Sequence, residues 1–189
     1  IFLSVVSSDA WDALAWHAQR VATVDLGGRP CRIGRLELVE QVSWDRLRRG
    51  DGARAWLIEF LTPTVFRTNN RHSPLPSLAS MVRSPAEVWE RYGPLPSVQV
   101  SLPPGTAWVS ELDLRSVPFQ TTARPAQRGA RGKISVPSSV VGVLGRLLLH
   151  CEDADRAASL GALLDLANYT GIGSYRARGM GVVHVRSVR

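Results

Sequence analysis

The sequence has little cysteine and no long apolar run, and each shortage excludes a class of protein. Two cysteines, Cys31 and Cys151, lie far apart among 189 residues. This pattern argues against a zinc site or a disulfide framework and favours the reducing cytoplasm. No apolar run approaches the ~20 residues that span a bilayer, which excludes a transmembrane protein and a membrane partner.

Cofactor motifs are also missing. No His, Cys and carboxylate residues have the spacing of a metal site, and no Walker-type phosphate loop is present. The segment GIGSYRARGMG (171–181) is rich in glycine. However, it follows a predicted helix and precedes a predicted strand, the reverse of a dinucleotide-binding motif. We therefore expect no metal and no cofactor.

The start of the chain carries no targeting signal. Residues 1–6 are too few and lack the basic lead of a signal peptide. The chain also lacks an initiator methionine, so residues before Ile1 were either removed or not included. With 44% apolar and 21% charged residues, the composition supports a packed core in one domain or in two small ones.

The positive charge is concentrated in the last part of the chain. The net charge is +7, and residues 1–113 contribute nothing to it because they hold 12 arginines and 12 acidic residues. Residues 114–189 hold 11 basic and four acidic residues. A one-sided basic excess indicates a polyanionic partner. The alternative is a basic surface that only maintains solubility.

The order of predicted elements indicates an α+β protein with tandem ferredoxin-like (RRM-like) units, the first incomplete. Residues 1–50 predict strand 1–7, a helix capped by Ser8 or Asp9 and strand 31–42, and the polar stretch 48–53 separates this partial unit from residues 54–189. The second unit predicts β-α-β-β-α-β, the order of the split βαβ unit. Its expected elements are strands 55–67, 107–117, 140–151 and 182–188, helix 77–92, and a helix opened by Asp153 or Asp155. One apolar stripe is predicted along this last helix, formed by Ala157, Leu160, Gly161, Leu164 and Ala167.

Two details of this second unit can be checked against a structure. Ser84 to Glu87 has the pattern of a capping box with Pro85 at the first helical position, and Gly93 is a natural helix stop. In strand 107–117, apolar Trp108, Leu112 and Leu114 alternate with charged residues, which predicts one buried face. Residues 69–76 and 119–139 are expected to be loops.

Three motifs in the second unit resemble those of the Cas6 family of CRISPR-associated endoribonucleases, within the RAMP superfamily. EFLTPTVFR (59–67) is similar to the family's strand ending in Thr-Pro-Thr-x-Phe. VGVLGR (141–146) is similar to its Gly-x-x-Gly strand, with Gly142 and Gly145 in the glycine positions. LANYTGIGSYRARGMG (166–181) is similar to its helix and glycine-rich loop. The motifs occur in the family's order, and the resemblance covers about residues 54–189.

The glycine-rich loop has a chemistry of its own. Its glycines permit positive φ, its backbone N–H groups could cradle a phosphate, and its tyrosine could stack on a base. The alternative is a helix C-cap and a tight turn that need glycine for packing. The candidate RNA-binding residues of this loop are Gly171, Gly173, Tyr175, Arg176, Arg178, Gly179 and Gly181.

A second candidate is the acid-free loop 119–139, which could project as a hairpin into the groove of a folded RNA. The alternative is a solvated, disordered insertion. Arg146 on the following strand could extend the same surface, and Arg67 and Arg71 are further candidate contacts. The basic residues of this loop are Arg124, Arg128, Arg131 and Lys133.

The resemblance implies metal-independent cleavage of CRISPR precursor RNA within its repeats. The 2′-hydroxyl would attack the adjacent phosphate and leave a 2′,3′-cyclic phosphate, which requires a general base, a general acid and a cation. The family uses a histidine from the early part of its first unit, which we expect upstream of Ile1. The catalytic residues of this chain therefore stay unassigned.

The four histidines present do not fill that role. His17 is expected to be a partly buried structural residue and His184 to lie on the outer face of the last strand. His72 is the most exposed candidate. His150 adjoins Cys151, but neighbouring strand residues point to opposite faces, which argues against a Cys–His couple.

The expected partners are CRISPR repeat RNA and other Cas proteins of an effector complex. Two further functions stay open. The chain could be a non-catalytic RAMP-type subunit that holds guide RNA, or a ferredoxin-like domain that binds a small anion or another protein. In the last case, the two arginines of the glycine-rich loop would not affect RNA affinity.

Overall fold

The computed structural model describes residues 3–25, 29–68, 71–120 and 139–188, which belong to two compact units, Ile1–Ser43 and Trp44–Arg189. The division lies several residues before the polar stretch 48–53, because helix α2 (Trp44–Arg49) packs on helix α4 (Ala154–Thr170) of the second unit and buries Leu47. No helix in the described ranges is long and apolar enough to cross a membrane.

The first unit contains helix α1 (Ser8–Ala18) and a short antiparallel hairpin of strands β1 (Thr23–Asp25) and β2 (Pro30–Arg32). The helix is capped one residue earlier than expected, by the Ser7 side chain, which accepts the N–H of Ala10 at 3.2 Å.

For the described residues, the prediction of two longer strands in this unit, 1–7 and 31–42, is wrong. Residues 3–7 and 33–43 form no strand. Leu38 and Val39, which lie within the predicted strand 31–42, are 52% and 75% exposed. A strand needs a neighbour for its backbone hydrogen bonds, and nothing beyond the β1–β2 hairpin supplies one in the described part of this unit. His17 is also exposed, not partly buried, and its ring makes an edge contact with Trp16.

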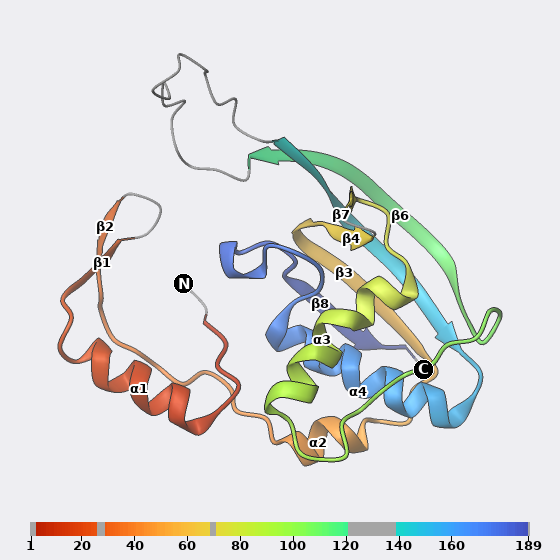
Figure 1. Cartoon of the computed structure of the whole chain (residues 1–189), viewed down its shortest axis with the longest axis horizontal. Helices are drawn as coiled ribbons and strands as arrows, with labels where there is room; N and C mark the ends of the chain where they lie inside the picture. Colours follow the sequence, from red (N-terminus) through yellow and green to blue (C-terminus); the bar gives the residue numbers. More distant parts are fainter. Residues whose placement is uncertain (1–2, 26–28, 69–70, 121–138, 189) are drawn as a thin grey trace. The chain divides into compact units, whose positions relative to one another are not determined.

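The second unit has the expected β-α-β-β-α-β order, which is confirmed (Figure 1). Its main sheet is antiparallel, with strands in the order β6-β7-β3-β8. The elements are β3 (Ala55–Thr64), α3 (Leu78–Tyr92), β6 (Ala107–Gln120), β7 (Ser139–Cys151), α4 (Ala154–Thr170) and β8 (Val183–Ser187).

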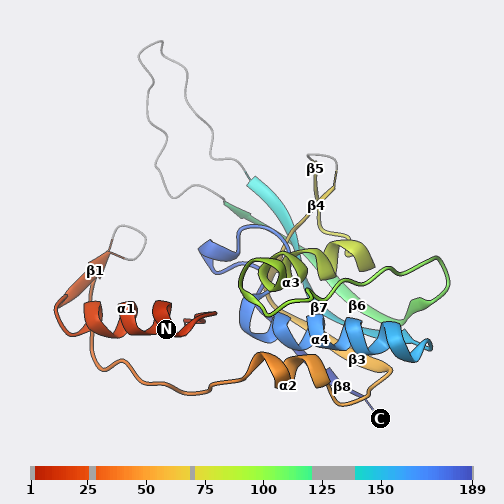
Figure 2. The ribbon, with the colours of Figure 1, turned by 60° about the horizontal axis from the view of Figure 1, so that its bottom comes forward.

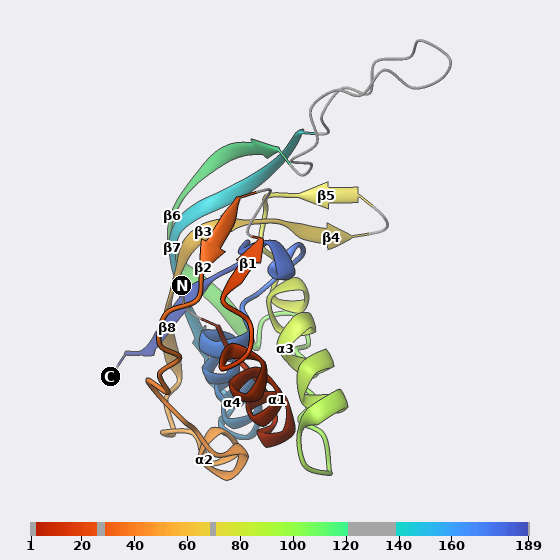
Figure 3. The same ribbon diagram turned by 90° about the vertical axis from the view of Figure 1, so that its left-hand side faces the viewer.

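Helices α3 and α4 cover one face of this sheet (Figure 3). On β3, Trp56, Ile58 and Phe60 point into the core, where Trp56 packs against Gly161 of α4. The Asp153 side chain caps α4. The predicted apolar stripe of α4 is confirmed, because each of its members is buried: Ala157, Leu160, Gly161, Leu164 and Ala167.

An additional hairpin follows β3. Strand β4 (Phe66–Thr68) pairs with β5 (Arg71–Ser73), so part of the expected loop 69–76 is a strand. Figure 2 shows this hairpin projecting from the unit beyond α3. Residues 62–65, just before this hairpin, comprise the last three residues of β3 and Val65, which bridges to Ser174.

Two local predictions are corrected. Helix α3 begins after Ser77, which forms a capping box with Ser80, so Pro85 lies inside the helix and not at its first position. In β6, Trp108 and Leu112 are 41% and 63% exposed instead of buried. Because β6 is the edge strand and its register shifts between Val109 and Glu111, most of its side chains lie beyond the cover of the helices.

Strands β6 and β7 form a long ribbon. They pair from Ala107 opposite Cys151 to Gln120 opposite Ser139. Strand β3 pairs with β7 only as far as Thr64 opposite Val143. The far part of the ribbon therefore continues past the end of β3.

The glycine-rich loop is fastened to residues 62–65 by hydrogen bonds. The N–H of Val182 donates to Thr62 Oγ1 at 2.9 Å, and the N–H of Ser174 donates to the Val65 carbonyl at 2.7 Å. The N–H of Gly173 donates to the buried Ser84 side chain at 3.0 Å, so Ser84 holds this loop and does not start a helix.

Asp165 of α4 makes the stability of this unit depend on pH. Burial, together with the nearby negative charge of Asp51, raises the pKa of Asp165 from 3.8 to about 6. The positive charge of Arg46 lowers this pKa, but by less. Between these two values the unfolded chain loses the proton first, so folding stability falls as pH rises from about 4 to 6.

We expect Asp165→Asn to stabilise the protein by about 1 kcal/mol above pH 6, since solvent screening reduces the shift's full value of ~3 kcal/mol. Below pH 4 the variant and the wild type should unfold alike. Thermal melts across this pH range measure the difference, and a constant difference at every pH would contradict this role of Asp165.

The loop glycines give a second test. Gly179 and Gly181 both have positive φ, 77° and 71°, but a Cβ on Gly181 would collide with the Ile172 carbonyl, whereas one on Gly179 meets nothing within 4 Å. We expect Gly179→Ala to cost about 1 kcal/mol through its backbone conformation, and Gly181→Ala a further ~1–3 kcal/mol through overpacking. Urea unfolding would show the difference, and equal losses would refute the packing argument.

Candidate nucleic-acid interface

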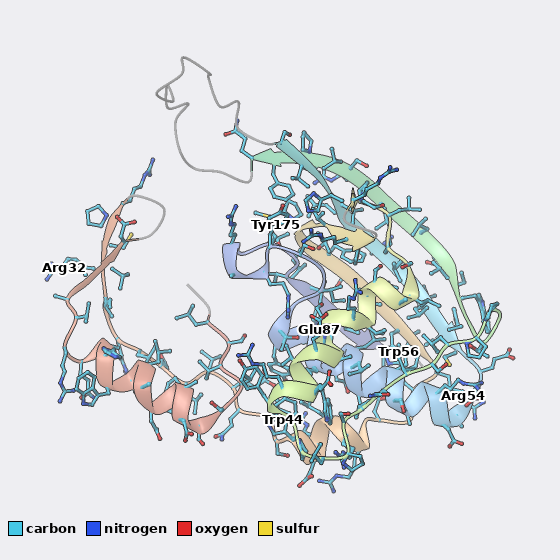
Figure 4. The ribbon with its side chains drawn as sticks, in the orientation of Figure 1. Arg32, Trp44, Arg54, Trp56, Glu87 and Tyr175 are labelled. Atoms are coloured by element: carbon cyan, nitrogen blue, oxygen red, sulfur yellow. The ribbon has the colours of Figure 1, made fainter. Side chains whose placement is uncertain are left out.

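The tip of the glycine-rich loop presents Tyr175 toward the β4–β5 hairpin. Tyr175 adopts the left-handed conformation with φ 63°, which a bulky residue rarely does. It precedes the 3₁₀ turn η1 (Arg176–Arg178). Its Oη lies 3.2 Å from His72 Nε2, although the two residues are 103 positions apart. Tyr175 is labelled in Figure 4.

Two other side chains complete a group around this tyrosine. Phe119, near the end of β6, contacts its ring edge-on with centroids 6.3 Å apart. The Arg178 guanidinium lies 5.5 Å from the ring centroid, a cation–π distance. We call Tyr175, His72, Phe119 and Arg178 the tyrosine cluster. The sequence singled out Tyr175, Arg178 and His72 separately, but no sequence signal indicated that they meet or that Phe119 joins them.

The hairpin beside the tyrosine cluster is basic. Arg67 and Arg71 are exposed, and Arg67 stands opposite His72 in the β4–β5 pair. The Arg83 guanidinium of α3 donates to the Arg67 carbonyl at 3.4 Å and forms an exposed ion pair with Glu87 at 3.8 Å. Guanidinium groups are suited to phosphate, and aromatic rings to bases, so this group has the chemistry of an RNA contact.

The backbone of the loop is not available as a phosphate cradle at its glycines. Each of the four N–H groups already donates to an acceptor in the protein, as the following bonds show. Gly171 donates to Ala167 O at 2.8 Å, Gly173 to Ser84 Oγ at 3.0 Å, Gly179 to Arg176 O at 3.0 Å and Gly181 to Pro63 O at 3.3 Å. The packing alternative accounts for these four N–H groups, so the glycines themselves do not cradle a phosphate through them.

The remaining candidate residues are dispersed. Arg176 is half-buried and donates to the Thr170 carbonyl at 3.3 Å. Arg146 lies in the middle of β7, 3.9 Å from Asp113, and no contact in the described ranges joins it to the glycine-rich loop. The basic residues of the loop 119–139 lie outside the described residues: Arg124, Arg128, Arg131 and Lys133.

The other histidines of the second unit are engaged elsewhere. His150 stacks on Trp108 with centroids 5.4 Å apart and contacts Ser110 Oγ at 2.7 Å. Cys151 points to the opposite, buried side, where desolvation raises the pKa of its thiol, so no Cys–His couple forms. His184 lies on the outer face, as expected, 3.2 Å from Glu59. The described residues contain no group of three or more potential metal ligands.

Residues 58–183 match the family described as CRISPR-associated endoribonuclease Cas6, while no curated protein matches the chain. Several solved structures are similar to it, among them the following three. A Cas6 (TTHA0078) product complex has a TM-score of 0.64 and 27% identity, over 87% of this chain and 66% of that one. Thermus thermophilus Cas6 (TTHB231) has a TM-score of 0.58 and 24% identity, over 77% and 58%. A Cas6-related protein from Pyrococcus furiosus has a TM-score of 0.54 and 10% identity, over 98% and 67%.

The likenesses to Thermus thermophilus Cas6 (TTHB231) and to the Pyrococcus furiosus protein are below 25% identity and concern the fold alone. The chain spans 66% of the TTHA0078 protein and 58% of the TTHB231 protein. The family match carries more weight. It runs from β3 to the start of β8 and therefore includes residues 62–65, the β4–β5 hairpin and the whole glycine-rich loop. Because it takes in more than half of the chain, the protein belongs to the Cas6 family of CRISPR-associated endoribonucleases.

Proposed function

We propose that this protein binds CRISPR precursor RNA and takes part in its metal-independent cleavage within the repeats. The family match over residues 58–183 carries the proposal. The structural relatives named above include a Cas6 bound to its product. The tyrosine cluster and the basic hairpin supply, in this chain, the side-chain chemistry that RNA binding needs.

In this proposal, side chains hold the RNA. Arg178, Arg67 and Arg71 contact phosphates, and the aromatic group of Tyr175 and Phe119 contacts a base or a ribose. Unpaired nucleotides are the natural target, because their bases are free to meet aromatic side chains. The residues of the loop 119–139 and Arg176 extend this surface, and repeat RNA is the partner.

The cleavage step is a transesterification. The ribose 2′-oxygen forms a bond to the adjacent phosphorus, the bond to the 5′-oxygen breaks, and a 2′,3′-cyclic phosphate remains. The proton leaves the 2′-hydroxyl for a general base, and another reaches the leaving oxygen. We assign no proton-transfer role to His150 and His184, which are engaged with Ser110 and Glu59.

The same proposal includes two ferredoxin-like units in tandem, with residues 1–50 as part of the first and 54–189 as the second. The chain's 87% overlap with a longer Cas6 structure supports this arrangement. In the described part of residues 1–43, helix α1 and the β1–β2 hairpin represent such a unit.

RNA affinity tests the binding part. We expect Arg178→Ala to weaken binding of repeat RNA about three- to tenfold and to lower the salt slope by about one, because one phosphate contact is lost. Arg91→Ala, on the exposed side of α3, is the control and should leave the RNA affinity and its salt slope unchanged. Fluorescence anisotropy at several salt concentrations measures both quantities. Affinity independent of salt, or equal for both variants and the wild type, would contradict phosphate binding at the loop.

Cleavage tests the catalytic part. The native, full-length protein is incubated in EDTA with end-labelled repeat RNA and with the same RNA carrying one 2′-deoxy substitution at the cut site. We expect cleavage at a single position that the substitution abolishes. Tight binding without cleavage would contradict the nuclease and favour the alternative, a subunit that holds guide RNA.

A further inference from the structure

His72 stands on the β4–β5 hairpin and contacts the tip of the glycine-rich loop. It is exposed, and its Nε2 lies 3.2 Å from Tyr175 Oη. The centroids of the two rings are 5.4 Å apart, and the rings are tilted by 45°. An imidazole nitrogen accepts from a hydroxyl in one tautomer and donates to it in the other, so both tautomers of His72 allow this hydrogen bond.

Tyr175 occupies a backbone conformation that favours glycine. Its φ is 63° and its ψ is 22°. The other residues of this loop with positive φ are all glycines, at positions 171, 173, 179 and 181. A side chain at such a position disfavours the folded loop, because its Cβ crowds the backbone. A tyrosine here therefore indicates that contacts of its ring and hydroxyl offset this strain.

The hairpin that carries His72 is held in place without the Tyr175 side chain. Next to β4, the N–H of Ser174 donates to the Val65 carbonyl at 2.7 Å. Strand β5 lies against β7 of the main sheet, and within the hairpin His72 pairs with Arg67. Backbone contacts thus fix the position of the imidazole, which can hold the tyrosine ring in turn.

The position of Tyr175 also determines that of Arg178. The N–H of Arg178 donates to the Tyr175 carbonyl at 2.8 Å, and its guanidinium lies 5.5 Å from the centroid of the tyrosine ring. Phe119 contacts the same ring edge-on. A guanidinium beside a fixed aromatic pair is suited to the phosphate and the base of one unpaired nucleotide.

We propose that His72 is a positioning residue for RNA binding: through its hydrogen bond to Oη, it holds Tyr175 and Arg178 in the arrangement that receives an unpaired nucleotide. This role rests on the RNA binding proposed above. The bond needs a hydroxyl, which explains a tyrosine where phenylalanine would supply the same ring. Because His72 acts through Tyr175, its loss should weaken RNA binding and leave the cleavage step itself unchanged.

Hydrogen exchange of the free protein tests the positioning without RNA. We expect His72→Ala and Tyr175→Phe each to speed exchange of the Arg178 amide about three- to tenfold, because the turn opens more often once the ring is released. His72→Gln, whose side-chain amide can bond the same hydroxyl, should exchange within about twofold of the wild type. Unchanged exchange in both His72→Ala and Tyr175→Phe would overturn the proposal.

His150→Ala is the matched control. His150 likewise lies near a hydroxyl, 2.7 Å from Ser110 Oγ, and stacks on an aromatic ring, that of Trp108. However, it stands at the C-terminal end of β7, one residue before Cys151. This variant should leave the exchange of the Arg178 amide and the RNA affinity unchanged. Circular dichroism shows whether each variant is folded.

RNA binding and cleavage by the native, full-length protein test the consequence. We expect His72→Ala and Tyr175→Phe each to weaken the affinity for repeat RNA about three- to fivefold, and the double variant to bind no more weakly than either, because both changes remove the same bond. The maximal single-turnover cleavage rate should stay within about twofold of the wild type. Losses that multiply in the double variant, or a lower maximal rate with unchanged affinity, would overturn the proposal. If the wild type bound no repeat RNA, the proposed function would fail, whereas the exchange data would still decide whether His72 positions Tyr175.

Discussion

The hydrogen bonds between residues 62–65 and the glycine-rich loop are the constraint on which the rest of the second unit depends. They close the connection from α4 to β8 against the end of β3. They bring backbone against backbone, which explains the glycine at position 173, where a Cβ would meet the Val65 carbonyl; at Gly181 a Cβ would meet the Ile172 carbonyl within the loop itself. The same contact carries Tyr175 to His72, so the tyrosine cluster exists only because this packing is close.

The element order of the second unit could be predicted because its signals are local. The alternation of Trp56, Ile58 and Phe60 and the stripe of α4 are each set by one element packing on one core. The motifs around residues 62–65 and 171–181 were also visible in the sequence. Their spacing reflects the hydrogen bonds that join them, although the sequence favoured a phosphate cradle over the packing that the structure shows.

What could not be predicted depends on partners distant in sequence. Ser84 has the local pattern of a helix cap, but its hydroxyl is buried and accepts the N–H of Gly173. Leu112 alternates like a core residue, yet it lies on an edge strand outside the helices. Likewise, residues 33–43 have the composition of a strand but no neighbour to pair with in the described part of their unit.

The β6–β7 ribbon has a mechanical consequence. Fourteen residues of β6 extend over about 46 Å, while only the nearer part is braced by β3. The unbraced part of the ribbon can therefore pivot near Gly145, where the pairing of β3 with β7 becomes irregular. The part of the ribbon beyond Gly145 is about 20 Å long, so a rotation of about 5° at that point displaces the far end by roughly 2 Å, and a few residues near Gly145 govern the position of that end.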